Sequence, residues 1–87
     1  DVREYPEYAA GRIPGARLIQ LGELERRAGE LDPARPVYVV CRSGRRGAKA
    51  QERLGELGVK EVHNVGGGVL AWEASGYQVE RNARTPR

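Results

Sequence analysis

The sequence has a single cysteine, a single histidine and no long apolar run, and each scarcity excludes a class of protein. One thiol cannot close an internal disulfide, so the fold does not depend on oxidation, and we expect a reducing, cytoplasmic location. No stretch approaches the roughly 20 apolar residues of a membrane span, and no signal-peptide pattern is visible. A zinc site would need carboxylates at a spacing that the sequence does not show. We therefore expect no metal, no cofactor and no membrane partner.

Aromatic residues are also few, at 6% of the chain, whereas charged residues make up 31%. The net charge of +3 favours anions in general. Nucleic acid is not an expected partner, because no base-stacking motif or basic helix stripe accompanies the charge. With 87 residues, of which 39% are hydrophobic, the composition is that of one small α/β domain.

The cysteine lies in a loop between two segments of regular structure. Residues 36–40 are an apolar run typical of a strand, and residues 48–57 favour a helix. The loop between them is Cys41-Arg42-Ser43-Gly44-Arg45-Arg46-Gly47. Because residues 42–47 contain no proline, every N–H of the loop can donate a hydrogen bond, and the start of the helix favours an anion. The sequence therefore predicts an anion-binding loop around Cys41.

Two readings of this loop are open from the residues alone. A lone cysteine is commonly a small buried hydrophobe, and a run of arginines is commonly a solvated cluster. A helix start with nearby cations, however, lowers a thiol pKa and produces a reactive thiolate. We favour the reactive thiolate, with the Arg46 side chain reaching toward the anion and with Arg42 and Arg45 setting the potential at the loop mouth.

The remaining chain predicts alternating strands and helices. The apolar positions 21, 24, 28 and 31 lie on one face of a helix, and positions 50, 54 and 57 lie on one face of a second helix that Gly58 caps. Short strands are expected at residues 16–19, 37–40 and 59–65, and the strand at 37–40 should be covered on both faces by helices. This order implies a parallel sheet with right-handed crossovers. We expect one domain over residues 1–80 and a loose basic tail over residues 81–87.

Other conspicuous residues have a structural interpretation that we favour over a catalytic one. His63 falls in the last parallel strand, which argues against a cysteine–histidine protease. The run at 66–68 is all glycine but lacks the lysine and spacing of a phosphate loop, so a tight turn that brings the last helix near the active loop is favoured. Trp72 and Tyr77 are expected to pack in the core and at its rim.

Four blocks in order make the chain resemble the rhodanese-like sulfurtransferase family in its single-domain form. They are Asp1-Val2-Arg3-Glu4 with Glu7-Tyr8, then Gly11-Arg12-Ile13-Pro14-Gly15-Ala16, the loop Cys41 to Arg46, and Gly67-Gly68 with Ala71-Trp72. The resemblance implies an α/β fold with a central, mostly parallel sheet and helices on both faces. It departs at Arg12, where many relatives have histidine, and most of the first strand is expected to lie before residue 1.

The resemblance also implies an activity. Cys41 would take a sulfane sulfur from a small anionic donor such as thiosulfate or a persulfide. It would hold that sulfur as its own persulfide and pass it to cyanide or to a thiol, including the thiol of a thioredoxin-like protein. Its catalytic residue is Cys41, and the substrate-binding residues are Arg42, Ser43, Gly44, Arg45 and Arg46.

Two other functions stay open beside this one. A cysteine-dependent phosphatase or arsenate reductase would place an arginine six positions after the cysteine, where this chain has Gly47. A non-catalytic rhodanese-like binding module is usually recognised by loss of the cysteine, which is present here.

Overall fold

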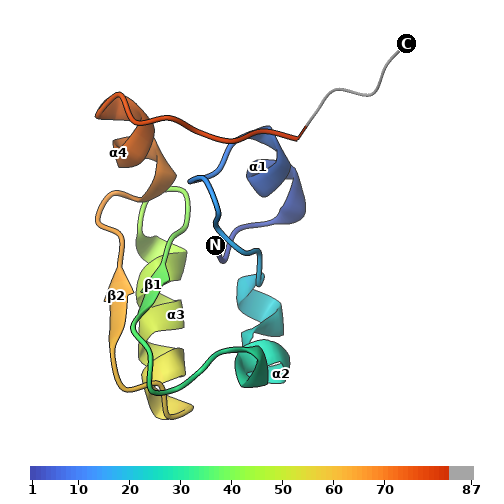
Figure 1. Cartoon of the computed structure of the whole chain (residues 1–87), viewed down its shortest axis with the longest axis vertical. Coiled ribbons are helices and arrows are strands. Elements are labelled where there is room, and N and C mark those ends of the chain that lie inside the picture. The colour runs from blue at the N-terminus through green and yellow to red at the C-terminus, as the bar shows by residue number, and fades with distance from the viewer. Residues whose placement is uncertain (83–87) are drawn as a thin grey trace.

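The computed structural model describes residues 1–82, which form short helices around a pair of strands (Figure 1). In chain order the elements are α1 (Tyr5–Ala10), η1 (Leu21–Glu23), α2 (Leu24–Arg27), η2 (Ala28–Glu30), β1 (Val37–Val39), α3 (Arg45–Glu56), β2 (Val62–Asn64) and α4 (Gly68–Ala74). Strands β1 and β2 are parallel and are joined by α3, as a parallel connection requires. Figure 1 shows α1 and α4 at the end of the molecule toward which both strands run. The loop between β1 and α3 lies at that end.

The helix predicted from the spacing of Leu21, Leu24, Ala28 and Leu31 is confirmed. The elements η1, α2 and η2 follow one another without a break, as a tight turn, an α-helical turn and a second tight turn. Leu24 is buried, and the other three apolar residues pack against the same core. Leu31 is already extended, so the helix ends just before Asp32 and Pro33, where a residue preceding proline disfavours helix.

The parallel pair is confirmed, with Tyr38 opposite His63 in its register. Helix α3 packs on one face of the pair and buries Ala50 and Leu54 there. Tyr38 on β1 is nevertheless 66% exposed. Because side chains alternate between faces, Tyr38 and His63 share the outer face, where their rings stack with centroids 5.0 Å apart. The two rings therefore pack on each other at an exposed part of the sheet.

The N-terminal residues hydrogen-bond to the chain just after β1 without forming a regular strand. The Asp1 amine donates to the Arg17 carbonyl at 2.8 Å, and the Asp1 carbonyl accepts from Ile19 N–H at 2.9 Å. On the other side, Val2 N–H donates to the Val40 carbonyl at 2.9 Å. The strand predicted at residues 16–19 is wrong: these residues form no strand, and their hydrogen bonds to residues 1–4 are the two to Asp1.

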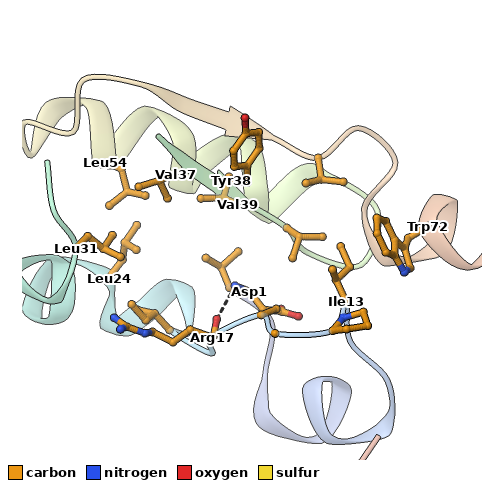
Figure 2. Close-up of a pocket in the computed structure, with 17 residues that line it drawn as sticks. Asp1, Ile13, Arg17, Leu24, Leu31, Val37, Tyr38, Val39, Leu54 and Trp72 are labelled. Atoms are coloured by element: carbon orange, nitrogen blue, oxygen red, sulfur yellow. Dashed lines mark hydrogen bonds between the residues drawn. The ribbon is translucent and has the colours of Figure 1, made fainter. Parts of the chain in front are cut away.

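An apolar groove lies beside Asp1, between β1 and the segment at residues 13–31 (Figure 2). Its volume is about 440 Å³, and its walls include Leu24, Leu31, Val39 and Leu54.

The end of the described chain returns to the N-terminal half. Arg12 and Glu80 form an antiparallel bridge, and Asn82 N–H donates to the Ala9 carbonyl at 3.1 Å. The division into a domain at 1–80 and a basic tail at 81–87 stays a prediction, because residues 83–87 lie outside the described residues. Within residues 1–82, no helix has the length and apolar character needed to cross a membrane.

Candidate functional site

The loop predicted from the sequence lies between the end of β1 and the start of α3. Val40, the residue after β1, is buried, and Cys41 is 1% exposed, so the thiol lies in the interior at the end of the strand. Gly44 precedes the helix with φ of 112°, a left-handed conformation that glycine adopts without strain. The chain therefore turns through Arg42, Ser43 and Gly44 and directs its next N–H groups back toward Cys41.

The sulfur of Cys41 is surrounded by backbone donors. Gly44 N–H lies 2.9 Å from Sγ. Burial alone would raise the pKa of the Cys41 thiol, but the N–H groups of Gly47, Gly44, Ser43 and Arg46 together outweigh burial and lower the pKa. A thiolate at this position is stabilised because these hydrogen bonds are stronger to the charged sulfur than to the neutral thiol. The structure thus supports a reactive thiolate over inert filler.

Helix α4 holds the outer side of the loop. Val69 N–H donates to the Cys41 carbonyl at 2.9 Å, and Leu70 N–H donates to the Arg42 carbonyl at 3.1 Å. Gly68 makes this approach possible, because a Cβ built there would lie 2.3 Å from the Cys41 carbonyl oxygen. The glycine run is therefore the tight turn that the sequence predicted, and it brings the last helix against the active loop.

The three loop arginines occupy different environments. Arg42 and Arg45 are exposed, in keeping with a cationic mouth. The guanidinium of Arg46 instead forms a bidentate ion pair with Glu7 of α1, with Nη1–Oε1 at 2.7 Å and Nη2–Oε2 at 2.9 Å. This pair lowers the pKa of Glu7 to about 2 and raises that of Arg46. We expected the Arg46 side chain to reach toward a bound anion. These contacts argue against that role, because the carboxylate of Glu7 already neutralises the Arg46 guanidinium.

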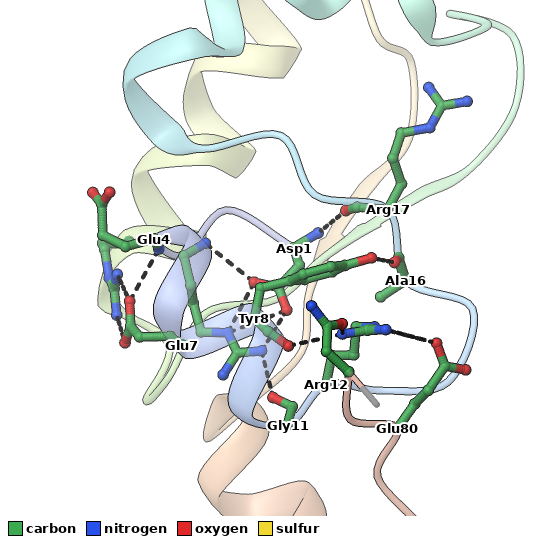
Figure 3. Close-up of polar contacts among 12 residues, drawn as sticks. Asp1, Glu4, Glu7, Tyr8, Gly11, Arg12, Ala16, Arg17 and Glu80 are labelled. Atoms are coloured by element: carbon green, nitrogen blue, oxygen red, sulfur yellow. Dashed lines mark hydrogen bonds and ion pairs between the residues drawn. The ribbon is translucent and has the colours of Figure 1, made fainter. Parts of the chain in front are cut away.

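A second ion pair joins Arg3 to Asp1, and Arg3 is only 4% exposed. Its guanidinium binds the Asp1 carboxylate at 2.7 Å and the Gly11 carbonyl at 2.7 Å (Figure 3). Burial lowers the pKa of Arg3, although Glu7 and the Cys41 thiolate oppose the change. Arg3 and Arg42 also line a small polar pocket of about 220 Å³ beside the loop.

The departure at Arg12 touches no part of the loop. Its guanidinium lies 4.3 Å from the centre of the Tyr8 ring and binds Glu80 and Asn82 (Figure 3). A cation over an aromatic face is attractive, so Arg12 serves to fasten the end of the described chain to α1.

Asn64, the last residue of β2, is a contact that sequence reasoning missed. Its Nδ2 donates to the Gly44 carbonyl at 3.0 Å from a position 20 residues later in the chain. A Cβ built on Gly47 would meet Asn64 Oδ1 at 2.2 Å. The only sequence signal is that the position ends a strand at the ligand edge of a parallel sheet.

The other residues considered from the sequence lie apart from the thiol. His63 is in β2 as predicted, and its Nε2 lies 2.8 Å from Glu61 on the exposed face. Trp72 is half-buried, donates to the Gln78 carbonyl and packs against Tyr77, with ring centroids 4.8 Å apart. Within the described part of the chain, no group of three His, Cys, Asp or Glu side chains is placed to hold a metal.

Comparison with known proteins agrees with this geometry. A model of the rhodanese-like domain matches residues 1–75. The Bacillus subtilis protein YrkF is 44% identical over 72 residues, which cover 83% of this chain but only 39% of YrkF. The thiosulfate sulfurtransferase GlpE of Pseudoalteromonas translucida is 33% identical over 75 residues, covering 86% of this chain and 71% of that protein.

A solved structure is similar along almost the whole chain. The rhodanese-like domain of the Anabaena protein Alr3790 superposes with a TM-score of 0.86 at 28% identity, covering 99% of this chain and 93% of that one. The fold agrees with the resemblance stated from the sequence. The chain belongs to the rhodanese-like domain family.

Proposed function

We propose that this domain is a sulfurtransferase in which Cys41 carries one sulfur atom, as a persulfide, from an anionic donor to a nucleophilic acceptor. The observation that carries the proposal is the buried Cys41 sulfur with the Gly44 nitrogen 2.9 Å away, in a loop whose N–H groups at Ser43, Gly44, Arg46 and Gly47 lower the pKa of the thiol. Donors fixed in advance around a developing anion stabilise it without reorganisation. The terminal sulfur of a persulfide is such an anion.

In the first step the Cys41 thiolate attacks the outer sulfur of thiosulfate. The attacking electron pair forms the new S–S bond, while the S–S bond of thiosulfate breaks and sulfite leaves with the bonding pair. One thiolate charge and two thiosulfate charges become one persulfide charge and two sulfite charges. No general base takes part, because the lowered pKa of Cys41 supplies the thiolate.

In the second step the acceptor attacks the terminal sulfur of the persulfide. Cyanide takes that sulfur as thiocyanate, and the Cys41 thiolate returns as the leaving group. A thiolate acceptor, whether small or on a thioredoxin-like protein, takes it as a persulfide in the same way. One sulfur atom passes from Cys41 to the acceptor, and the total charge is unchanged. The Cys41 thiolate, held by the loop N–H groups, can then react with the next molecule of thiosulfate.

The arginines divide into two roles under this proposal. Arg42 and Arg45 are exposed at the loop and supply the positive potential that draws an anionic donor. Arg46 acts through its backbone N–H at the sulfur, while its side chain anchors the loop to α1 through Glu7. A single free thiol that must stay reduced suits a reducing compartment, and we therefore place the activity in the cytoplasm.

The phosphatase and arsenate reductase alternative finds little support in the loop. An arginine at position 47 would need space that the Asn64 side chain occupies, because even a Cβ there lies 2.2 Å from Oδ1. A binding module without catalysis would not need donors aimed at a thiol. We therefore retain sulfur transfer as the function that the geometry supports best.

The test is intact mass after treatment with thiosulfate. We expect wild-type protein to gain one sulfur atom, cyanide to remove it as thiocyanate, and the Cys41→Ser variant to gain none. Glutathione persulfide, offered as a second donor, separates a wrong donor from a wrong mechanism. If neither donor adds sulfur to folded wild-type protein, the proposal fails. Hydrolysis of an aryl phosphate that depends on Cys41 would favour the phosphatase instead.

A further inference from the structure

Asn64 makes one hydrogen bond of unusual position. Its Nδ2 donates to the Gly44 carbonyl at 3.0 Å, and Ala48 N–H donates to the same oxygen at 3.0 Å. A carbonyl oxygen has two lone pairs, so these two donors saturate it. The Gly44 carbonyl is thus held on the side of the loop away from the thiol.

This carbonyl belongs to the residue on which the loop turns. Gly44 has φ of 112° and its own N–H donates to Cys41 Sγ at 2.9 Å. Glycine populates both signs of φ, so its flanking peptide units can rotate unless something fixes them. Rotation that turned the Gly44 carbonyl inward would aim a partial negative charge at the sulfur. Asn64 is the side chain that opposes this rotation.

The other end of the Asn64 amide is left without a partner. Oδ1 is buried, and among residues 1–82 no group donates a hydrogen bond to it. An unpaired buried acceptor is costly, and exchanging the oxygen and nitrogen would face Oδ1 toward the Gly44 carbonyl. Oδ1 is accommodated only because position 47 is glycine. A leucine would fill the same space without an unpaired oxygen, so packing alone does not account for asparagine here.

We propose that Asn64 is a positioning residue for sulfur transfer, which fixes the Gly44 carbonyl outward and so keeps the loop N–H groups directed at the Cys41 sulfur. The kinetic part of this inference rests on the proposed function. The part concerning the thiolate does not, because it can be measured with no sulfur donor present.

The test compares Asn64→Leu with the wild type. Ultraviolet absorbance of the thiolate is followed against pH, with Cys41→Ser protein as the blank for tyrosine ionisation. We expect the apparent pKa of Cys41 to rise and the rate of persulfide formation at a fixed low thiosulfate concentration to fall about tenfold, the loss expected for one hydrogen bond to a charge-stabilising loop. The melting temperature should be unchanged or higher, because the unpaired Oδ1 is gone.

The charged groups near Cys41 are the same in all of these proteins. Arg3 and Arg46 interact with Cys41 directly, and Glu4, Glu7 and Glu73 act on those two arginines. Arg42 and Arg45 are the exposed cations of the loop and the start of α3. A change in the thiol pKa therefore reports the loop donors rather than a new charge. His63→Gln is the matched control, because His63 precedes Asn64 on β2 but lies on the exposed face.

Asn64→Ala removes the same donor without adding bulk and keeps the test decisive if leucine prevents folding. An apparent Cys41 pKa that is unchanged in a folded Asn64 variant overturns the inference. A raised pKa in both Asn64 variants with an unchanged His63→Gln value supports it, whether or not thiosulfate proves to be a donor. A raised pKa with no sulfur transfer in wild-type protein would count against the proposed function alone.

Discussion

Replacing Glu7 by glutamine should destabilise the domain by removing the ion pair that joins α1 to the first turn of α3. The two guanidinium nitrogens of Arg46 lie 2.7 and 2.9 Å from the two carboxylate oxygens of Glu7, a bidentate geometry between residues 39 positions apart. Glutamine has nearly the same shape but no charge. The change therefore leaves Arg46 without its counterion while keeping the packing around it.

The magnitude follows from the pKa of Glu7 and from its exposure. A pKa of about 2, caused first by the hydrogen bonds from Arg46, corresponds to at most about 3 kcal/mol of preferential interaction with the charged carboxylate. The side chains of Arg46 and Glu7 are 32% and 29% exposed, so solvent screens the pair. We therefore expect a loss of about 1 kcal/mol, or a melting temperature lower by roughly 4–8 °C for a domain of this size.

The effect should depend on pH with a definite sign. The folded-state pKa of Glu7 is lowered, so the stabilisation is present above the ordinary value of 4.5 and is lost as the pH falls through about 2. Thermal unfolding of wild type and Glu7→Gln should therefore differ at neutral pH and converge in acid. The control is Glu56→Gln on α3, whose ion pair with Arg53 is longer, at 3.6 Å, and more exposed. Equal melting temperatures at neutral pH, or a difference that persists at low pH, would refute the reasoning.

Two further predictions concern the outer side and the mouth of the loop. Gly68→Ala should lower the melting temperature strongly, by the equivalent of about 2–3 kcal/mol, because φ is +60° and the added Cβ meets two carbonyl oxygens within 2.5 Å. Gly55→Ala is its control, since nothing lies within 4 Å of that Cβ and alanine should stabilise α3 by about 0.5–1 kcal/mol. Arg42→Ala and Arg45→Ala should raise the KM for thiosulfate several-fold, without a change in melting temperature, and added salt should reduce the difference from wild type. An unchanged KM for both variants would remove the cationic mouth from donor binding.

The parts of the site that the sequence predicted are those that neighbouring residues determine. Three features were informative because each depends only on residues close together in the sequence. They are the apolar run before Cys41, the absence of proline in the loop after it, and the amphipathic spacing of α3. They therefore predicted strand, donor-rich loop and helix correctly. The turn at residues 66–68 was predictable for the same reason, because three glycines allow backbone conformations that few other residues adopt.

What the sequence did not predict depends on pairs that are distant in the chain. Arg46 looks like a free cation until the fold brings Glu7 beside it, and nothing in the spacing of 39 residues indicates that pairing. In the sequence Asn64 is only the polar end of a strand, and its hydrogen bond to Gly44 appears only in the folded chain. Tyr38 lies within a continuous apolar run, which gives no sign that its side chain is 66% exposed.

The separation of donors from acceptors around the thiol explains how an uncharged backbone can hold an anionic sulfur. The carbonyls of Cys41 and Arg42 are taken by α4, and the Gly44 carbonyl is taken by Asn64 and Ala48. These three carbonyls are thus paired away from the sulfur, whereas the N–H groups of Ser43, Gly44, Arg46 and Gly47 act on it. The field at the sulfur depends on all these outer contacts together, because one inward carbonyl would offset one N–H donor. Under the proposed function, Arg42 and Arg45 are then available to attract the incoming sulfur donor, because the backbone N–H groups stabilise the persulfide.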